Sequence, residues 1–355
     1  MNEKRKRILK MLEEGHITAE EADSLLETLD DQQGKSEFTK TENNEEQKKS
    51  IQDSIKSFTE GIFNIIDETV QKVKEGTFTF GSSHIDVERN FTFLGNDVRF
   101  LNCDLSNASV KILPSDDDFI RIEMNGKVYK ETDQEVAEKL FDKYVSVHFT
   151  NDSLNIEQDR KTISINITIY LPRKSYEQAY LKTVNGSFTI KSSYIKVARI
   201  SSINGSIKLS DYKGDALYTE TKHGSLRLDQ IEVSKIKAET VTGSLYVDGM
   251  LEHLDGDVVT GSIKVFIRNN DAEQADLKTT TGSITLSIPN EMLVKGEASS
   301  NFGGIDIQIP RMTISQLENQ AFKRYYEFQN FNNSADYFEV DLSTKTGSIN
   351  ISTLY

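Results

Sequence analysis

Carboxylates, histidines and recurring serines are the residues that could do chemistry, but their spacing singles out no reactive group. The five histidines, at positions 16, 84, 148, 223 and 253, lack the spacing of metal ligands. A serine follows a glycine again and again along the chain, whereas a catalytic serine is a single residue that needs a neighbouring base. The sequence therefore predicts a protein without enzymatic activity and without a cofactor.

One set of aspartates leaves an enzyme open as an alternative. Asp211, Asp229 and Asp248 each follow an apolar–polar–apolar triplet by one or two positions. In adjacent coils of a repeat such aspartates would stack, and carboxylates that converge on one groove can cleave a polysaccharide by acid–base catalysis. Aspartate is also common in turns, so the solubility of a turn explains the same residues equally well.

Two weaker signals are interpreted as structural. His253 lies near Asp255 and Asp257, a combination that is typical of a solvated turn. The segment Gly303-Gly304-Ile305-Asp306 is faintly similar to a calcium-binding nonapeptide repeat, but it occurs once. The glycines are isolated rather than clustered as a phosphate cradle, which argues against a nucleotide site.

Charge and composition exclude several classes of partner. The 355 residues include 42 Lys and Arg against 56 Asp and Glu, a formal net charge of −14. This balance argues against nucleic acid and against simple adhesion to anionic lipid, and it permits cationic partners such as basic peptides. The one cysteine, Cys103, can form no internal disulfide and no cysteine-based zinc site.

The N-terminal segment bears on location. Residues 1–7 are basic, but an amphipathic stretch follows them rather than the apolar region of a signal peptide. No apolar run approaches the roughly 18 residues that span a bilayer. We therefore expect a cytoplasmic protein that contacts a membrane peripherally at most, with export to the cell surface by a non-standard route as the alternative.

An internal repeat is the strongest feature of the chain. Segments of the form Thr-x-x-Gly-Ser-Ile-x-Leu recur with glycine spacings of 19, 19, 19, 18, 21, 21 and 44, the last being two periods with an insertion. Weaker copies without the glycine occur at 107–112 and 151–156. We predict structural turns at the repeat glycines, which are Gly186, Gly205, Gly224, Gly243, Gly261, Gly282, Gly303 and Gly347.

Two architectures fit the repeat. The alternation after each Gly-Ser predicts a strand with one buried face, and a glycine can take the positive φ of a bend without strain. Asn185-Gly186 and Asn204-Gly205 are typical of hairpins, which would give an antiparallel β-sandwich. A nearly constant period favours a parallel β-helix-like solenoid, whose coils stack. The solenoid predicts one interior row formed by Ile207, Leu226, Leu245, Ile263 and Ile284.

The remaining segments complete a four-part organisation. Residues 1–30 predict a helical hairpin, 31–50 a disordered linker, 51–76 an amphipathic helix and 77–355 the mainly β repeat domain. The hairpin either packs on its own chain or serves self-association. Within the repeat domain, the sequence from Thr132 predicts a helix of about three turns with a capping box. The aromatic residues within 311–338 predict a C-terminal cap or a contact surface.

The amphipathic helix has three possible roles. Its apolar stripe could cap one end of the solenoid, pair with a partner helix or a second copy, or lie on a membrane, although its polar face is not rich in lysine. The candidate membrane or partner face consists of Ile55, Phe58, Ile62, Ile66 and Val70.

The start of the chain and the repeat together carry a resemblance. Residues 8–26, Ile-Leu-Lys-Met-Leu-Glu-Glu-Gly-His-Ile-Thr-Ala-Glu-Glu-Ala-Asp-Ser-Leu-Leu, resemble the SHOCT-like module that opens YvlB/LiaX-type proteins of Gram-positive bacteria. The repeat resembles the "putative adhesin" β-strand-repeat domain that follows the module in that family. The resemblance implies a β-helix-like domain, no catalytic residues, and a role in cell-envelope stress, including responses to antimicrobial peptides.

The function predicted from these observations is that of a non-enzymatic binding or scaffold protein in the envelope-stress response. Its partners would be proteins, such as a membrane sensor or a second copy, or cationic membrane-active peptides. A surface adhesin and a polysaccharide-active β-helix enzyme are the alternatives.

Overall fold

The computed structural model describes residues 83–354, apart from residues 96, 151, 321–322 and 332–335. The chain divides into two compact units, Met1–Thr79 and Phe80–Tyr355, and the description below concerns the second unit. The predicted 1–30 hairpin, 31–50 linker and 51–76 helix lie outside the described residues.

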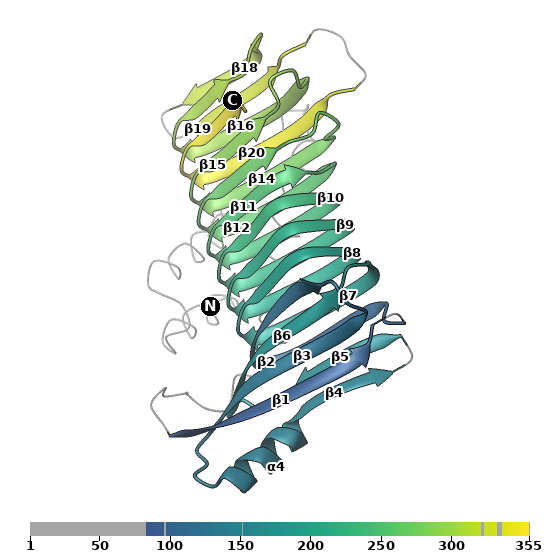
Figure 1. Ribbon diagram of the computed structural model, residues 1–355. Helices are drawn as coiled ribbons and strands as arrows, with labels where there is room; N and C mark the ends of the chain where they lie inside the picture. The colour runs from purple at the N-terminus through teal and green to yellow at the C-terminus, as the bar shows by residue number, and fades with distance from the viewer. Residues whose placement is uncertain (1–82, 96, 151, 321–322, 332–335, 355) are drawn as a thin grey trace, which may run out of the picture. The chain divides into compact units, whose positions relative to one another are not determined.

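The described strands form a solenoid with two long sides, which we call sheet I and sheet II. Strands β2, β8, β9 and β10 bend and run through both sheets, so all strands are connected through hydrogen bonds (Figure 1). Sheet I consists, in spatial order, of β1 (His84–Leu94), β3 (Phe119–Tyr129), β6 (Ile163–Pro172), the second half of β2 (Phe100–Ser115), the first parts of β8 (Phe188–Asn204), β9 (Ile207–His223) and β10 (Leu226–Thr242), then β11 (Leu245–Met250), β13 (Ile263–Ile267), β15 (Ile284–Ile288), β21 (Ile349–Thr353) and β17 (Ile305–Gln308).

Sheet II is formed by the other half of each coil. Its strands, in spatial order, are β4 (Val145–Thr150), β5 (Ser153–Gln158), the first half of β2, β7 (Ser175–Asn185), the later parts of β8, β9 and β10, then β12 (His253–Thr260), β14 (Gln274–Thr281), β20 (Phe338–Thr346), β16 (Val294–Phe302), β19 (Lys323–Gln329) and β18 (Thr313–Gln320). Neighbouring strands are parallel except at the ends of the two sheets. The predicted parallel solenoid is confirmed, and the antiparallel sandwich is not favoured.

The core lies between the two sheets because every second side chain of each strand points inward. The predicted interior row is confirmed: in-register strands place Ile207, Leu226, Leu245, Ile263 and Ile284 in one line, and all are buried. Each such side chain stabilises the fold by about 1.5–3 kcal/mol. The weaker copy at 107–112 lies in β2, and residues 153–156 of the other weaker copy lie in β5, at the start of the stack.

Helix α4 (Gln134–Tyr144) lies at the N-terminal end of the stack, where it contacts β1, β3 and β4. Its N-cap is Asp133, whose side chain accepts a hydrogen bond from the Val136 amide, rather than Thr132, which the capping-box pattern would place there. Ala137 and Phe141 are buried. A Cβ atom at Gly126 of β3 would overlap the Phe141 ring, so this glycine allows the helix to approach the sheet.

The C-terminal end corrects the predicted stacking order. The spacing of 44 was interpreted as a coil that follows Gly303, whereas β20 pairs with both β14 and β16. The last coil of the chain therefore lies between two earlier ones, and Figure 1 shows yellow β20 between the green strands β14 and β16. The aromatic 311–338 segment supplies the antiparallel β18–β19 hairpin, which covers the end of sheet II through β16. The β18–β19 hairpin thus occupies the outermost place in sheet II, and the last coil of the chain lies between two earlier coils.

Candidate functional site

The predicted turn glycines form one column along the stack. A Cβ atom would overlap the Ala108 carbonyl oxygen at Gly186, and the carbonyl oxygen of a stacked glycine at Gly205, Gly224, Gly243, Gly261, Gly282, Gly303 and Gly347. Five of these positions also have φ between 145° and 151°, namely Gly186, Gly243, Gly261, Gly282 and Gly347. Close approach of stacked turns therefore requires glycine even where the backbone angle does not.

Hydroxyl groups connect these turns from coil to coil. The Ser206 amide donates to Ser187 Oγ at 3.1 Å, and the Ser225 amide donates to Ser206 Oγ at 3.1 Å. Thr221 Oγ1 donates to the Gly205 carbonyl at 2.8 Å, and Thr240 Oγ1 to the Gly224 carbonyl at 2.9 Å. The recurring serines thus accept hydrogen bonds from the backbone, which gives them a structural role.

The outer face of sheet II is rich in carboxylates, with Lys237 and Lys278 among them. In-register strands bring its carboxylates into two adjacent rows, although they come from seven different strands. We call this set the acidic face; it consists of Glu220, Glu239, Asp255, Asp257, Asp276, Asp341, Glu297 and Glu327.

The carboxylates of the longer row are neighbours on successive strands. Asp255 pairs in register with Asp276, Asp276 with Asp341, and Asp341 with Glu297. Parallel strands lie about 4.8 Å apart, so like charges face one another along the row. Lys278 partly offsets them, since its Nζ lies 3.0 Å from a carboxylate oxygen of Asp276.

Burial and these neighbouring charges shift the pKa values of the carboxylates. Burial, and then the charges of Asp255 and Glu239, raise the pKa of the Asp257 carboxyl to about 7. Loss of solvent, and then the charge of Asp276, raise the pKa of Asp341 to about 6, although that residue lies at the surface. Burial raises the pKa of Asp255 as well. The Asp257 Oδ1 atom is buried without a hydrogen-bond partner in the described part of the chain. These carboxylates therefore take up protons at a higher pH than an ordinary aspartate does.

The acidic face was missed from the sequence, although a signal was present. When the repeats are aligned on their glycines, Glu220, Glu239 and Asp257 occupy the column four residues before the glycine. Asp255, Asp276, Glu297 and Asp341 occupy the column six residues before it. Both columns point outward, so the alignment alone could have predicted the two rows.

The aspartates considered for catalysis lie elsewhere, toward sheet I. Asp229 and Asp248 are in register on β10 and β11, whereas Asp211 lies at a bend with φ 52°. Asp248 receives two hydrogen bonds from Arg268, at 2.6 and 2.8 Å, which lower its pKa. Arg227 lies 3.3 Å from Asp229. An aspartate held ionised by an arginine is a poor proton donor, so this arrangement gives no support to acid–base catalysis.

The two weaker chemical signals, at His253 and at Gly303–Asp306, belong to side chains that form ordinary contacts within the strands. His253 lies on sheet II, where its Nε2 is 3.4 Å from a Glu273 carboxylate oxygen. Asp306 of the Gly303–Asp306 segment accepts a hydrogen bond from Gln308 at 2.7 Å on the edge strand β17. Among the residues that the structure describes, no group of three or more potential ligands could hold a metal ion.

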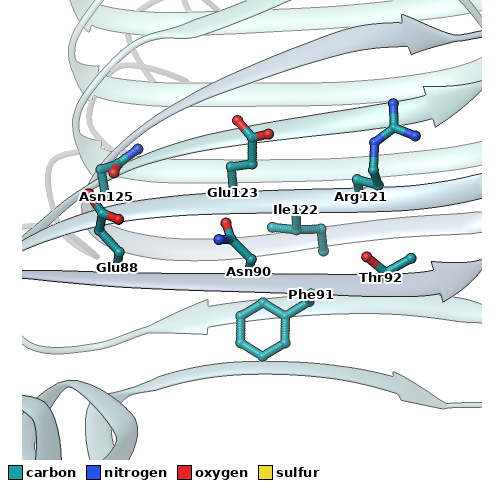
Figure 2. A pocket seen from close by; sticks show the side chains of 8 residues that line it. All are labelled: Glu88, Asn90, Phe91, Thr92, Arg121, Ile122, Glu123 and Asn125. Carbon is teal, nitrogen blue, oxygen red and sulfur yellow. The ribbon is translucent and has the colours of Figure 1, made fainter.

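A shallow polar hollow of about 300 Å³ lies on the outer face of β1 and β3. Three cross-strand pairs line it, and Figure 2 shows their polar side chains on neighbouring strands: Glu88 with Asn125, Asn90 with Glu123, and Thr92 with Arg121. Tyr170 of β6 borders the hollow, with its ring 5.3 Å from the Arg121 guanidinium. The hollow offers hydrogen-bonding groups of both kinds, donors and acceptors.

The proposed membrane or partner face, Ile55, Phe58, Ile62, Ile66 and Val70, lies outside the described residues. Within the described part, no helix has both the length and the apolar character to cross a membrane.

Comparison with known proteins places these features in a family. Residues 98–352 match the family described as Toastrack DUF4097, and residues 3–34 match a SHOCT-like domain. The "Uncharacterized protein YvlB" of Bacillus subtilis is 30% identical over 215 residues, which are 57% of this chain and 57% of YvlB. The chain thus spans little more than half the length of this relative.

Solved structures of low sequence identity are also similar. A "putative adhesin" from Bacteroides fragilis is 11% identical, with 76% of this chain and 98% of that chain covered and a TM-score of 0.43. A "putative lipid binding protein" from Parabacteroides distasonis is 13% identical, with 76% and 97% covered and a TM-score of 0.39.

Proposed function

The chain belongs to the Toastrack DUF4097 family, and from that premise we propose that it is a non-enzymatic binding or scaffold protein that responds to cationic, membrane-active peptides during cell-envelope stress. The observation that carries this proposal is the acidic face of sheet II. The solenoid supplies a rigid scaffold, and the face supplies negative charge over several adjacent strands.

A cationic peptide fits this face by charge and by shape. Carboxylates recur at each strand along the row from Asp255 to Glu297, so a chain with several lysines can contact several of them at once. Each exposed ion pair contributes only about 0–1 kcal/mol, and useful affinity therefore requires several pairs. Such binding is steered by long-range attraction and weakens as salt screens the charges.

The proposal extends to location and partners. We place the protein in the cytoplasm, peripheral to the membrane, where it would modulate a membrane-bound sensor. Fractionation of stressed cells into cytosolic, membrane and protease-accessible surface material tests this part, since release of its peptides by surface proteolysis would favour the adhesin alternative.

Calorimetric titration of the full chain with an unstructured oligolysine peptide tests the binding face. We expect the double variant Asp276→Asn/Asp341→Asn to weaken binding at least several-fold at pH 8. The control Asp118→Asn/Glu135→Gln removes the same charge from exposed positions outside the acidic face and should bind like the unaltered chain. Equal weakening in both variants, or none in either, would show that the acidic face is not the binding site.

A further inference from the structure

The outer face of sheet I carries a row of cations, next to a row in which Asp229 and Asp248 pair with Arg227 and Arg268. One outward row runs over adjacent strands from β2 to β15, and its side chains are Lys111, Thr189, Lys208, Arg227, Tyr246, Lys264 and Thr285. We call it the basic row. It contains no carboxylate, and its four cationic residues are exposed.

Most of these cations are available to a partner. Arg227 lies 3.3 Å from Asp229. Lys111, Lys208 and Lys264 form no ion pair with any residue that the structure describes. Lys191, in the next outward row on β8, is likewise exposed. Uncompensated lysines on a flat surface suit an anionic partner of similar extent.

The acidic face matches this row in spacing as well as in charge. Both belong to the same stack of strands, so charges on both faces recur at multiples of the same distance of about 4.8 Å. Two copies laid face against face can therefore align several cations with carboxylates, since Lys208 and Arg227 lie on neighbouring strands and Lys264 lies two strands beyond Arg227. An anionic lipid surface has no such fixed repeat.

We propose that the basic row on sheet I of one copy docks on the acidic face of sheet II of a second copy. In such a pair one copy keeps its acidic face free and the other keeps its basic row free, so the contact is head-to-tail and can continue to a third copy. This self-association does not depend on the proposed response to peptides, because it uses the two faces of the protein itself.

Sedimentation velocity of the full chain tests the proposal. We expect association at about 0.01 M salt, where the Debye length is about 30 Å, and monomers at about 1 M salt, where it is about 3 Å. The variant Lys208→Glu/Lys264→Glu cancels the net charge of the basic row, and the variant Asp276→Lys/Asp341→Lys places two cations at the centre of the longer acidic row. Each alone should remain monomeric at low salt, whereas an equimolar mixture should form a one-to-one dimer.

The mixture is also the control for folding, because misfolded variants would not restore association. The variant Lys130→Glu/Lys139→Glu, which changes the charge equally at exposed positions outside both faces, should associate like the unaltered chain. Monomers at low salt, or association that survives in both single-face variants, would overturn the proposal. Binding of the monomer to phosphatidylglycerol vesicles, lost in Lys208→Glu/Lys264→Glu, would instead assign the row to an anionic membrane and would equally overturn it.

Discussion

Asp276 and Asp341 lie opposite each other on the neighbouring strands β14 and β20, although β15 to β19 separate them along the chain. Insertion of the last coil places Asp341 between Asp276 and Glu297, so these three carboxylates face one another on consecutive strands. The order of the carboxylates in the candidate binding face therefore follows from the stacking order of the coils, and the predictions below test the face and the stack.

Binding of oligolysine should depend on pH in the range where the acidic face takes up protons. Burial raises the pKa of Asp257 to about 7 and that of Asp341 to about 6. Both lose negative charge as the pH falls through these values, so affinity should decrease between about pH 8 and about pH 5. Calorimetry at each pH measures this. An affinity that stays constant down to pH 5 would contradict the assignment of these carboxylates to the site.

The same shift predicts how stability depends on pH. Asp257 keeps its proton up to about pH 7 in the folded chain, whereas its ordinary pKa is 3.8. The folded state binds more protons between these values, so stability falls as the pH rises from about 4 to about 7. Asp257→Asn should therefore raise the Tm at pH 8 and leave it nearly unchanged at pH 4. The control Asp118→Asn should change neither, and a lower Tm for Asp257→Asn at pH 8 would refute the prediction.

The turn column can be tested with two glycines. Gly243→Ala should destabilise the protein by about 1–3 kcal/mol, because φ is 151° and the new Cβ atom would overlap the Gly224 carbonyl oxygen. Gly304→Ala is the matched control, since its Cβ atom would have only ordinary contact with Arg324 Nη1 at 3.4 Å. Denaturant unfolding measures both free energies. Equal stability of the two variants would disprove the close approach of stacked turns.

The hydroxyl contacts between coils make a smaller contribution. Thr240→Val removes the hydrogen bond from Thr240 Oγ1 to the Gly224 carbonyl, and its cost should be about 1 kcal/mol. Val258 occupies the next place in the same row, so the stack accommodates valine there. Thr285→Val on the outer face of sheet I is the control and should be nearly neutral. Equal unfolding free energies for the two variants would show that this hydrogen bond contributes nothing measurable.

The sequence predicted the parts of the fold that repeat. The glycine spacing and the alternation after each Gly-Ser predicted a parallel solenoid and the interior row from Ile207 to Ile284, because both follow from strand period alone. The position of the Gly347 coil in the stack could not be predicted from spacing. This coil lies before the Gly303 coil, and that order depends on long-range packing of the β18–β19 hairpin. The bends within β8, β9 and β10 were not predicted either. Ser192, Asp211 and Gln230 have φ between 47° and 52°, but none of them is a glycine, the residue type that would have indicated a positive φ.

The candidate site was likewise predictable only in the features that follow from the repeat. Asp255 and Asp257 were interpreted as part of a solvated turn near His253, whereas they lie on a strand in two charged rows. Their partners Asp341 and Glu297 come from coils whose order the sequence did not specify. Charge columns in the repeat alignment predict which residues face outward, but the neighbours of each carboxylate follow from the fold.

Cysteine cross-linking across β14 and β20 tests the position of Asp341 in the acidic row most directly. Lys278 is in register with Ser343 on the adjacent strand, whereas Ser299 lies one strand further, beyond Ser343. A disulfide requires Cα atoms within about 7 Å, so Lys278→Cys/Ser343→Cys should oxidise readily and Lys278→Cys/Ser299→Cys should not. Mass spectrometry of the oxidised proteins identifies the bond. Rapid disulfide formation with Ser299→Cys and none with Ser343→Cys would mean that the coils stack in chain order and that Asp341 does not lie between Asp276 and Glu297.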